Sequence, residues 1–162
     1  GAKDLSFILF CMSVVILVFI KFNFPKAQMF LGDSGAYLIG SFISVSVVST
    51  SILNPEISPF FFCIILFYLF FEVFFSFSRK IIIAKQNPLF PDNQHLHMRV
   101  YKFLLRKNYT KERANYSTAI YINLTYLLLI SPSVFLLENF IFCKYYFIFL
   151  LLVYIYFYKK IK

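Results

Sequence analysis

The sequence predicts an all-α, polytopic membrane protein with about five transmembrane helices and one long basic cytoplasmic loop that contains an amphipathic helix. Apolar residues make up 60% of the 162 residues, and charged residues make up only 14%. A soluble domain carries about 25% charged residues, and one core of this size could not bury so much Phe, Ile and Leu. Five apolar stretches also approach the roughly 17–25 residues that cross a bilayer.

The predicted spans follow one another along the chain. They are Leu5–Ile20, Ala36–Leu53, Pro59–Ser78, Ser117–Leu137 and Phe140–Tyr158. The chain begins at Gly1 and enters the first span almost at once, without the basic segment or cleavage site of a signal peptide. We therefore expect upstream sequence to be missing, and we expect residues 1–162 to be one part of a single multi-helix membrane domain.

Basic residues set the predicted orientation. The loop after the third span holds Arg79, Lys80, Lys85, Arg99, Lys102, Arg106, Lys107, Lys111 and Arg113, against only Asp92 and Glu112. The positive-inside rule places such a loop in the cytoplasm. Alternation then places Lys21–Gly35 and Lys159–Lys162 there too, so that fourteen of the sixteen Lys and Arg residues are inside. This orientation brings Asp33, His95 and His97 to one face of the membrane.

The first motif that could form a binding or catalytic site is Phe30-Leu31-Gly32-Asp33-Ser34-Gly35. Its glycines give the backbone freedom for a turn, and Asp33 or Ser34 could cap the helix that follows. An Asp at such a place could instead hold a hard cation such as Mg²⁺, which prefers a few carboxylate oxygens with phosphate oxygens and water. The residues alone leave the cap and the cation site equally open.

The second motif, Pro91-Asp92-Asn93-Gln94-His95-Leu96-His97, lies in the basic loop. Turn formers are followed by a helical pattern, in which His95, Arg99, Lys102 and Arg106 share one face. This basic amphipathic helix would suit an anionic membrane surface, and the same cationic stripe could grip a diphosphate. On a regular helix His95 and His97 would point roughly opposite ways, so they can act together only where the segment is extended or irregular.

Glu72 is an ionisable residue inside the third predicted span, roughly 10 Å from its cytoplasmic end. A charged group at that depth suggests a functional site. A buried Glu that is hydrogen-bonded to a neighbouring helix is an equally good interpretation. Arg79 lies on the same face but two turns away, too far for a direct contact along one helix.

Together these motifs resemble a known family. The Asp33 motif, followed by Leu38-Ile39-Gly40, is similar to the first signature of the polyprenyl-phosphate sugar-1-phosphate transferases, and residues 88–97 with Met98 are similar to the second. This superfamily, glycosyltransferase family 4, includes the undecaprenyl-phosphate N-acetylglucosaminyl-1-phosphate transferases and the phospho-MurNAc-pentapeptide translocases. The resemblance makes the chain the C-terminal half of such an enzyme. Met98 stands where peptidoglycan enzymes carry a third His, which argues against that branch.

The resemblance implies transfer of a sugar 1-phosphate from a UDP-sugar to undecaprenyl phosphate, which starts the assembly of a cell-envelope polysaccharide. It implies Mg²⁺ or Mn²⁺ as cofactor, with Asp33 as metal ligand. The implied catalytic residues are Asp33, His95 and His97, and the expected substrate-binding residues are Gly32, Ser34, Arg99 and Lys102. We expect a multi-pass protein of the inner (plasma) membrane with its site facing the cytoplasm, membrane lipids as further partners and no nucleic acid; a homodimer is left open.

The chain also departs from this family. The acidic Asp-Asp pair and the Asn/Asp-Gly-rich loop that other members carry upstream are absent from these residues. Phosphoryl transfer needs charge neutralisation and positioning of both substrates, so we expect the chain alone to be inactive. The alternative is a non-catalytic membrane module or a transporter fragment, which internal inverted repeats would favour; none is visible in the sequence.

Overall fold

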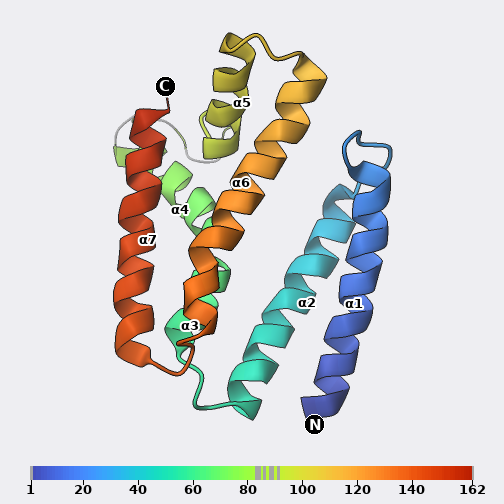
Figure 1. Ribbon diagram of the computed structural model, residues 1–162, viewed down its shortest axis with the longest axis vertical. Helices are drawn as coiled ribbons and strands as arrows, with labels where there is room; N and C mark the ends of the chain where they lie inside the picture. Colours follow the sequence, from blue (N-terminus) through green and yellow to red (C-terminus); the bar gives the residue numbers. More distant parts are fainter. Residues whose placement is uncertain (1, 83–84, 86, 88–89, 91, 162) are drawn as a thin grey trace. The chain divides into compact units, whose positions relative to one another are not determined.

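A computed structural model describes residues 2–82, 85, 87, 90 and 92–161 of the chain. These residues form seven α-helices and no strand, so the predicted all-α class is confirmed (Figure 1). Among the described residues, four helices are long and apolar enough to cross a membrane. A pair of helices joined by a bend could together form a fifth span. The chain divides into two compact units, Gly1–Ile57 and Ser58–Lys162.

The first unit is a helical hairpin of α1 (Ala2–Asn23) and α2 (Gly32–Leu53). Both helices pass as membrane spans and bury none of their apolar windows within the protein, as expected of helices that face lipid. The connection is closed by Asn23, whose side-chain oxygen accepts hydrogen bonds from the backbone N–H groups of Gln28 at 3.1 Å and Met29 at 2.9 Å. The two spans predicted in this region are confirmed, and each is longer than predicted.

In the second unit, the predicted span Pro59–Ser78 is broken. It consists of α3 (Pro59–Ile65) and α4 (Phe67–Ile82), which are bent by 76°. The break frees backbone carbonyls, and the Tyr126 hydroxyl donates to those of Ile64, at 3.1 Å, and Ile65. A carbonyl without a partner at membrane depth is costly, so Tyr126 makes the bend tenable. The sequence predicted this span without its break.

The predicted amphipathic helix is α5 (Leu96–Arg106), which packs against α6 (Lys111–Val134). Leu104 is buried, and Leu96, Val100 and Phe103 line an internal cavity. The apolar face of α5 therefore packs on the protein, and the expected place of this helix at a membrane surface stays a prediction. Helix α6 begins six residues before the predicted Ser117, where Thr110 accepts a hydrogen bond from the Arg113 N–H at 3.3 Å.

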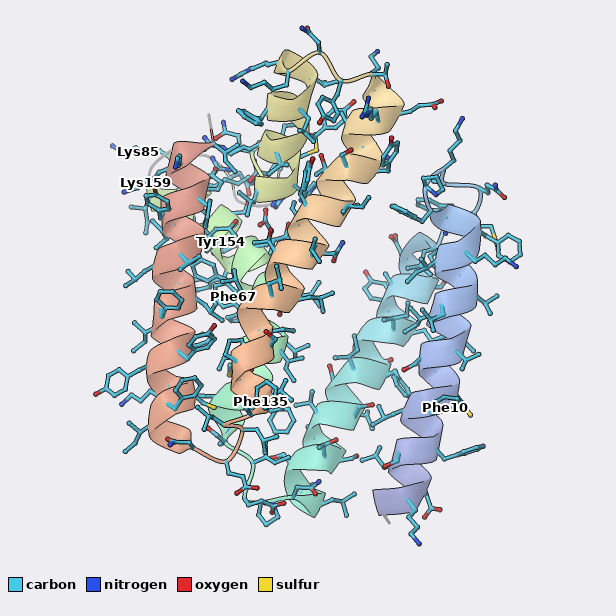
Figure 2. All side chains as sticks on the ribbon, in the orientation of Figure 1. Phe10, Phe67, Lys85, Phe135, Tyr154 and Lys159 are labelled. Atoms are coloured by element: carbon cyan, nitrogen blue, oxygen red, sulfur yellow. The ribbon has the colours of Figure 1, made fainter. Side chains whose placement is uncertain are left out.

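The last helix is α7 (Phe140–Lys160). In the second unit the end of α4, helix α5, the start of α6 and the end of α7 gather at one end, where Lys85 and Lys159 also lie (Figures 1 and 2). The opposite end holds the α6–α7 turn, where the Leu137 carbonyl accepts a hydrogen bond from the Ser58 N–H at 2.9 Å. This arrangement agrees with the alternation of spans used above, and the side of the membrane to which each end belongs stays a prediction.

Candidate functional site

Glu72 is the centre of a polar cluster in the second unit. Its side chain is buried, with 7% of the residue exposed. One carboxylate oxygen accepts a hydrogen bond from the Tyr154 hydroxyl at 2.6 Å, and the other accepts one from the Leu96 N–H at 2.6 Å and lies 3.1 Å from His95 Nδ1. Glu72 is therefore hydrogen-bonded to neighbouring helices, as one interpretation of this residue expected. It also contacts His95, a predicted site residue, so the interpretation as part of a functional site stays open.

His95 and His97 lie side by side despite their spacing. His95 is the residue before α5 and has extended backbone angles, φ −58° and ψ 151°. The two rings stack with centroids 5.4 Å apart and an angle of 10° between their planes. The irregular segment that the sequence required for joint action is therefore present. Burial lowers the pKa of His97, and His95 lowers it further, against an opposing effect of Glu72.

Asp92 fixes the loop that carries the histidines to α4. Its carboxylate pairs with Arg79 at 2.5 Å and accepts hydrogen bonds from the Ser76 hydroxyl and, at 2.9 Å, from the Gln94 N–H. Burial raises the pKa of Asp92, but the bonds from Ser76, Arg79 and Gln94 lower it more, to about 2. The turn role expected for Asp92 is present in its bond with Gln94, and Arg79, which cannot reach Glu72 along its own helix, is instead the partner of Asp92.

Sequence reasoning missed Ser76 and Tyr154. A signal for Ser76 existed, because Glu72, Ser76 and Lys80 recur every fourth residue on one face of an otherwise apolar helix. The Lys80 ammonium donates to the Phe90 carbonyl, so this polar face of α4 faces the loop. Nothing local singles out Tyr154 among the many aromatic residues of α7.

Arg99 and Lys102, the predicted substrate-binding cations, both contact the protein. The Arg99 guanidinium donates to the carbonyls of Tyr158 at 2.5 Å and Ile161 at 3.0 Å, and it lies 4.0 Å from the centre of the Tyr158 ring. Lys102 donates to the Asn93 carbonyl at 3.1 Å. A cation at the end of α7 also complements the helix dipole. Arg99 therefore joins α5 to the end of α7, and Lys102 joins α5 to the loop before it; the substrate-binding role of both residues stays a prediction.

Asp33 lies in the first turn of α2, in the first unit. The residue before this helix is Leu31, and no side chain caps it, so the expectation that Asp33 or Ser34 is the cap was wrong. Gly32 has φ +68°, a conformation that favours glycine. A side chain at Gly35 would approach Leu31 within 2.7 Å. Asp33 and Ser34 are exposed, and a common site of Asp33 with the histidines of the second unit stays a prediction.

The metal prediction rests on Asp33 alone. Among the described residues no three His, Cys, Asp or Glu side chains form a group that could hold a metal ion. Mg²⁺ is commonly held by one or two carboxylates together with substrate phosphates, and Asp33 fits one such carboxylate. Pro88, Leu89 and Pro91 of the second motif lie outside the described residues.

An apolar cavity of about 470 Å³ adjoins the Glu72 cluster. It lies between α4, α5, α6 and α7, and Leu96 and Tyr154 belong both to its wall and to the contacts of Glu72. Its volume falls in the range of about 300–1,000 Å³ that is usual for small-molecule sites. The second unit thus places an apolar space beside a carboxylate and an imidazole.

Comparison with known proteins links the first motif to a family. Residues 1–51 match Glycosyl transferase family 4. The resemblance to glycosyltransferase family 4 is confirmed over these residues. An 82-residue stretch, 51% of the chain, is 35% identical to the undecaprenyl-phosphate alpha-N-acetylglucosaminyl 1-phosphate transferase of Thermotoga maritima, of which it covers 26%. No solved structure matches the chain.

The family match covers the first motif but not the second. It contains Gly32, Asp33, Ser34 and Gly35, whereas the histidine loop lies beyond residue 51. The apolar helices of the described residues, four or up to five of them candidate membrane spans, are those of a multi-pass membrane protein. The matched stretch spans about a quarter of the relative's length, so the activity of a complete protein is considered below as a proposal.

Proposed function

We propose that this chain is part of a phosphotransferase that moves a sugar 1-phosphate from a UDP-sugar to undecaprenyl phosphate and thereby starts assembly of a cell-envelope polysaccharide. The observation that carries the proposal is the stacked pair of His95 and His97 beside a buried carboxylate, in a chain whose Asp33 motif matches the family. The similar protein of Thermotoga maritima is named an undecaprenyl-phosphate alpha-N-acetylglucosaminyl 1-phosphate transferase.

In the proposed reaction an oxygen of the lipid phosphate attacks the phosphorus that bears the sugar. The bond from this phosphorus to the oxygen shared with the other phosphate breaks, and UMP leaves with that oxygen. The products are a lipid diphosphate sugar and UMP. A bound Mg²⁺ or Mn²⁺ would neutralise charge on the diphosphate, with Asp33 as one carboxylate ligand. Gly32 and Ser34 would contact the substrate beside it.

The histidines would contact the diphosphate. A carboxylate can only accept hydrogen bonds, so a hydrogen bond across the 3.1 Å contact with Glu72 would require a proton on His95 Nδ1. The lowered pKa of His97 favours the neutral ring, which would keep one N–H donor for a phosphate oxygen and one nitrogen that can take a proton. Arg99 and Lys102 add positive charge nearby, which would attract a UDP-sugar in a salt-sensitive manner.

The proposal assigns this chain only part of the machinery. Asp33 is one carboxylate, whereas holding a metal and both phosphate substrates calls for several groups. The test is co-expression with a matching N-terminal half that carries the acidic pair, followed by a metal-dependent UMP-release assay. We expect release by the combined enzyme and none by the 162-residue chain alone. UMP release by the chain alone would overturn the proposal that the chain holds only part of the machinery. Absence of UMP release by the two co-expressed halves would overturn the proposed function.

A transporter fragment is the rival interpretation, and the bend of 76° between α3 and α4 is one feature in its favour, because broken helices often form transport sites. The family match supports the transferase instead. Vesicles that contain the combined protein would separate the two. Substrate accumulation without UMP formation would support transport, and UMP formation without accumulation would support the transferase.

A further inference from the structure

Tyr154 is a buried residue of α7 whose hydroxyl has a fixed direction. Its ring makes edge-to-face contacts with Phe71 at 4.9 Å and Phe75 at 5.4 Å, and the residue is 5% exposed. It lies between α7 and α4 in the second unit (Figure 2). The hydroxyl donates to Glu72 at 2.6 Å. Because aromatic neighbours hold the ring, this donor holds one oxygen of the carboxylate in place.

The other oxygen of Glu72 faces α5. It accepts the Leu96 N–H at 2.6 Å and lies 3.1 Å from His95 Nδ1. The carboxylate is therefore held at both ends, by α7 on one side and by the start of α5 on the other. Rotation of the Glu72 carboxylate about the last bond of its side chain would decide whether the contact with His95 is kept. The partner of one ring nitrogen decides which nitrogen carries the proton.

We propose that Tyr154 is a positioning residue, which acts through Glu72 to fix the orientation of His95 and its Nδ1–H tautomer. This tautomer leaves the His95 Nε2 lone pair available, whereas an unconstrained neutral histidine favours a proton on Nε2. The catalytic meaning of this role rests on the proposed function, because there His95 contacts the diphosphate. The tautomer itself is a property of the chain and needs no substrate.

Two other tyrosines of α7 serve as comparisons, because their hydroxyls do not contact Glu72. Tyr158, one turn further along, donates to the Gln94 carbonyl at 2.9 Å and so anchors the loop without contacting Glu72. Tyr156 is 58% exposed and pairs with Lys160 instead. Tyr154→Phe removes only the hydroxyl and keeps the aromatic contacts. Tyr156→Phe removes the same atom from the same helix and is the matched control.

The test is ¹⁵N NMR of histidine side chains in the whole 162-residue chain in lipid nanodiscs. The spectra are recorded at rising pH until the ring signals stop changing, because the ¹⁵N shifts of a neutral ring report its tautomer directly. We expect mainly Nδ1–H at His95 in the unmodified chain and after Tyr156→Phe. Tyr154→Phe should lower the ratio of Nδ1–H to Nε2–H at least ~3-fold, since one of the bonds that orient the carboxylate is lost.

A double substitution tests whether the effect passes through Glu72. Glu72→Gln should lower the same ratio, and adding Tyr154→Phe should then change nothing further, because two residues that act in series are not additive. An unchanged His95 tautomer in Tyr154→Phe, or a full additional effect in the Glu72→Gln background, would overturn the proposal. If Tyr154→Phe does not give the amide spectrum of a folded protein, the Glu72→Gln variant decides by itself. An unchanged His95 tautomer in that variant would overturn the proposal.

The combined enzyme separates this inference from the proposed function. Tyr154→Phe should lower kcat there and leave KM for the UDP-sugar unchanged, because the proposed role of Tyr154 is exerted through Glu72 and not on the substrate. A shifted tautomer with unchanged kcat would support the positioning role and contradict the catalytic role of His95. A combined enzyme without any activity would contradict the proposed function, and the tautomer measurement would still decide the role of Tyr154.

Discussion

Replacing Asp92 by Asn should undock the histidine loop from α4. Asn keeps the shape of the side chain and can still accept from the Gln94 N–H, but it removes the negative charge that faces Arg79. The Arg79 side chain is only 11% exposed, so its guanidinium would lose a partner that water does not fully replace. Loss of one member of a buried pair is costly for this reason.

The magnitude follows from the pKa of Asp92. A decrease from the ordinary 3.8 to about 2 means that the docked loop favours the carboxylate by about 1–2 kcal/mol, after allowance for screening at the edge of the protein. Since 1–2 kcal/mol changes an equilibrium about 5–30-fold, the undocked fraction of the loop should rise by about that factor in Asp92→Asn.

The same contact predicts a pH dependence. The folded pKa of Asp92 is depressed, so its contribution is fully present above the unfolded value of 3.8 and is lost as the pH falls through about 2. Loop docking in the unmodified chain should therefore weaken between these two values. In Asp92→Asn this part of the pH dependence should be absent.

Hydrogen exchange of two backbone amides measures loop docking. The Gln94 N–H donates to Asp92, and the Leu96 N–H donates to Glu72. Both amides should exchange about 5–30-fold faster in Asp92→Asn. Glu56→Gln, which removes an exposed carboxylate outside this loop, should leave both rates unchanged. Equal rates in Asp92→Asn and the unmodified chain, or the same increase in Glu56→Gln, would refute the role given to the Asp92–Arg79 pair.

Three further predictions test other parts of the structure. In the combined enzyme Asp33→Asn should reduce UMP release by at least ~10²-fold, as expected for loss of one electrostatic group, while the protein still inserts in the membrane; near-normal release would contradict a metal-binding role. A cysteine at Asn93 or Lys107 should react from outside intact cells only with a membrane-permeant reagent, whereas one at Asn54 should also react with an impermeant reagent; the opposite pattern would overturn the orientation. Tyr126→Phe leaves two carbonyls at the α3–α4 bend without their donor and should lower stability by about 0.5–2 kcal/mol in a denaturant titration; a loss no greater than that of Tyr145→Phe, which is exposed on α7, would show that the bend does not depend on this hydroxyl.

Local patterns account for the parts of the fold that were predictable. Hydropathy marked the spans, because a bilayer selects for length and apolarity. The helical spacing from Leu96 to Arg106 matches α5. The requirement that His95 leave the helix also held, since it depends only on the geometry of an i, i+2 pair. Periodicity along the chain was sufficient for each of these.

The parts that failed depend on contacts between distant residues. The bend at Leu66 has no Pro or Gly to announce it, and it is tenable because Tyr126, some 60 residues away, bonds the freed carbonyls. Tyr154 and Glu72 are 82 residues apart, so no local pattern joins them. Asp33 was expected as a cap because its residue type is a good one, but the helix begins at Gly32, so that Asp33 already lies inside its first turn.

The most direct test of the central claim uses a UDP-sugar labelled at the phosphorus that bears the sugar. The combined enzyme is supplied with this donor, undecaprenyl phosphate and Mg²⁺, and the lipid and nucleotide products are separated. Transfer of a sugar 1-phosphate predicts that the label moves into the lipid product and that the released UMP is unlabelled. Label that stays with the nucleotide as UDP, or no labelled lipid at all, would contradict the account.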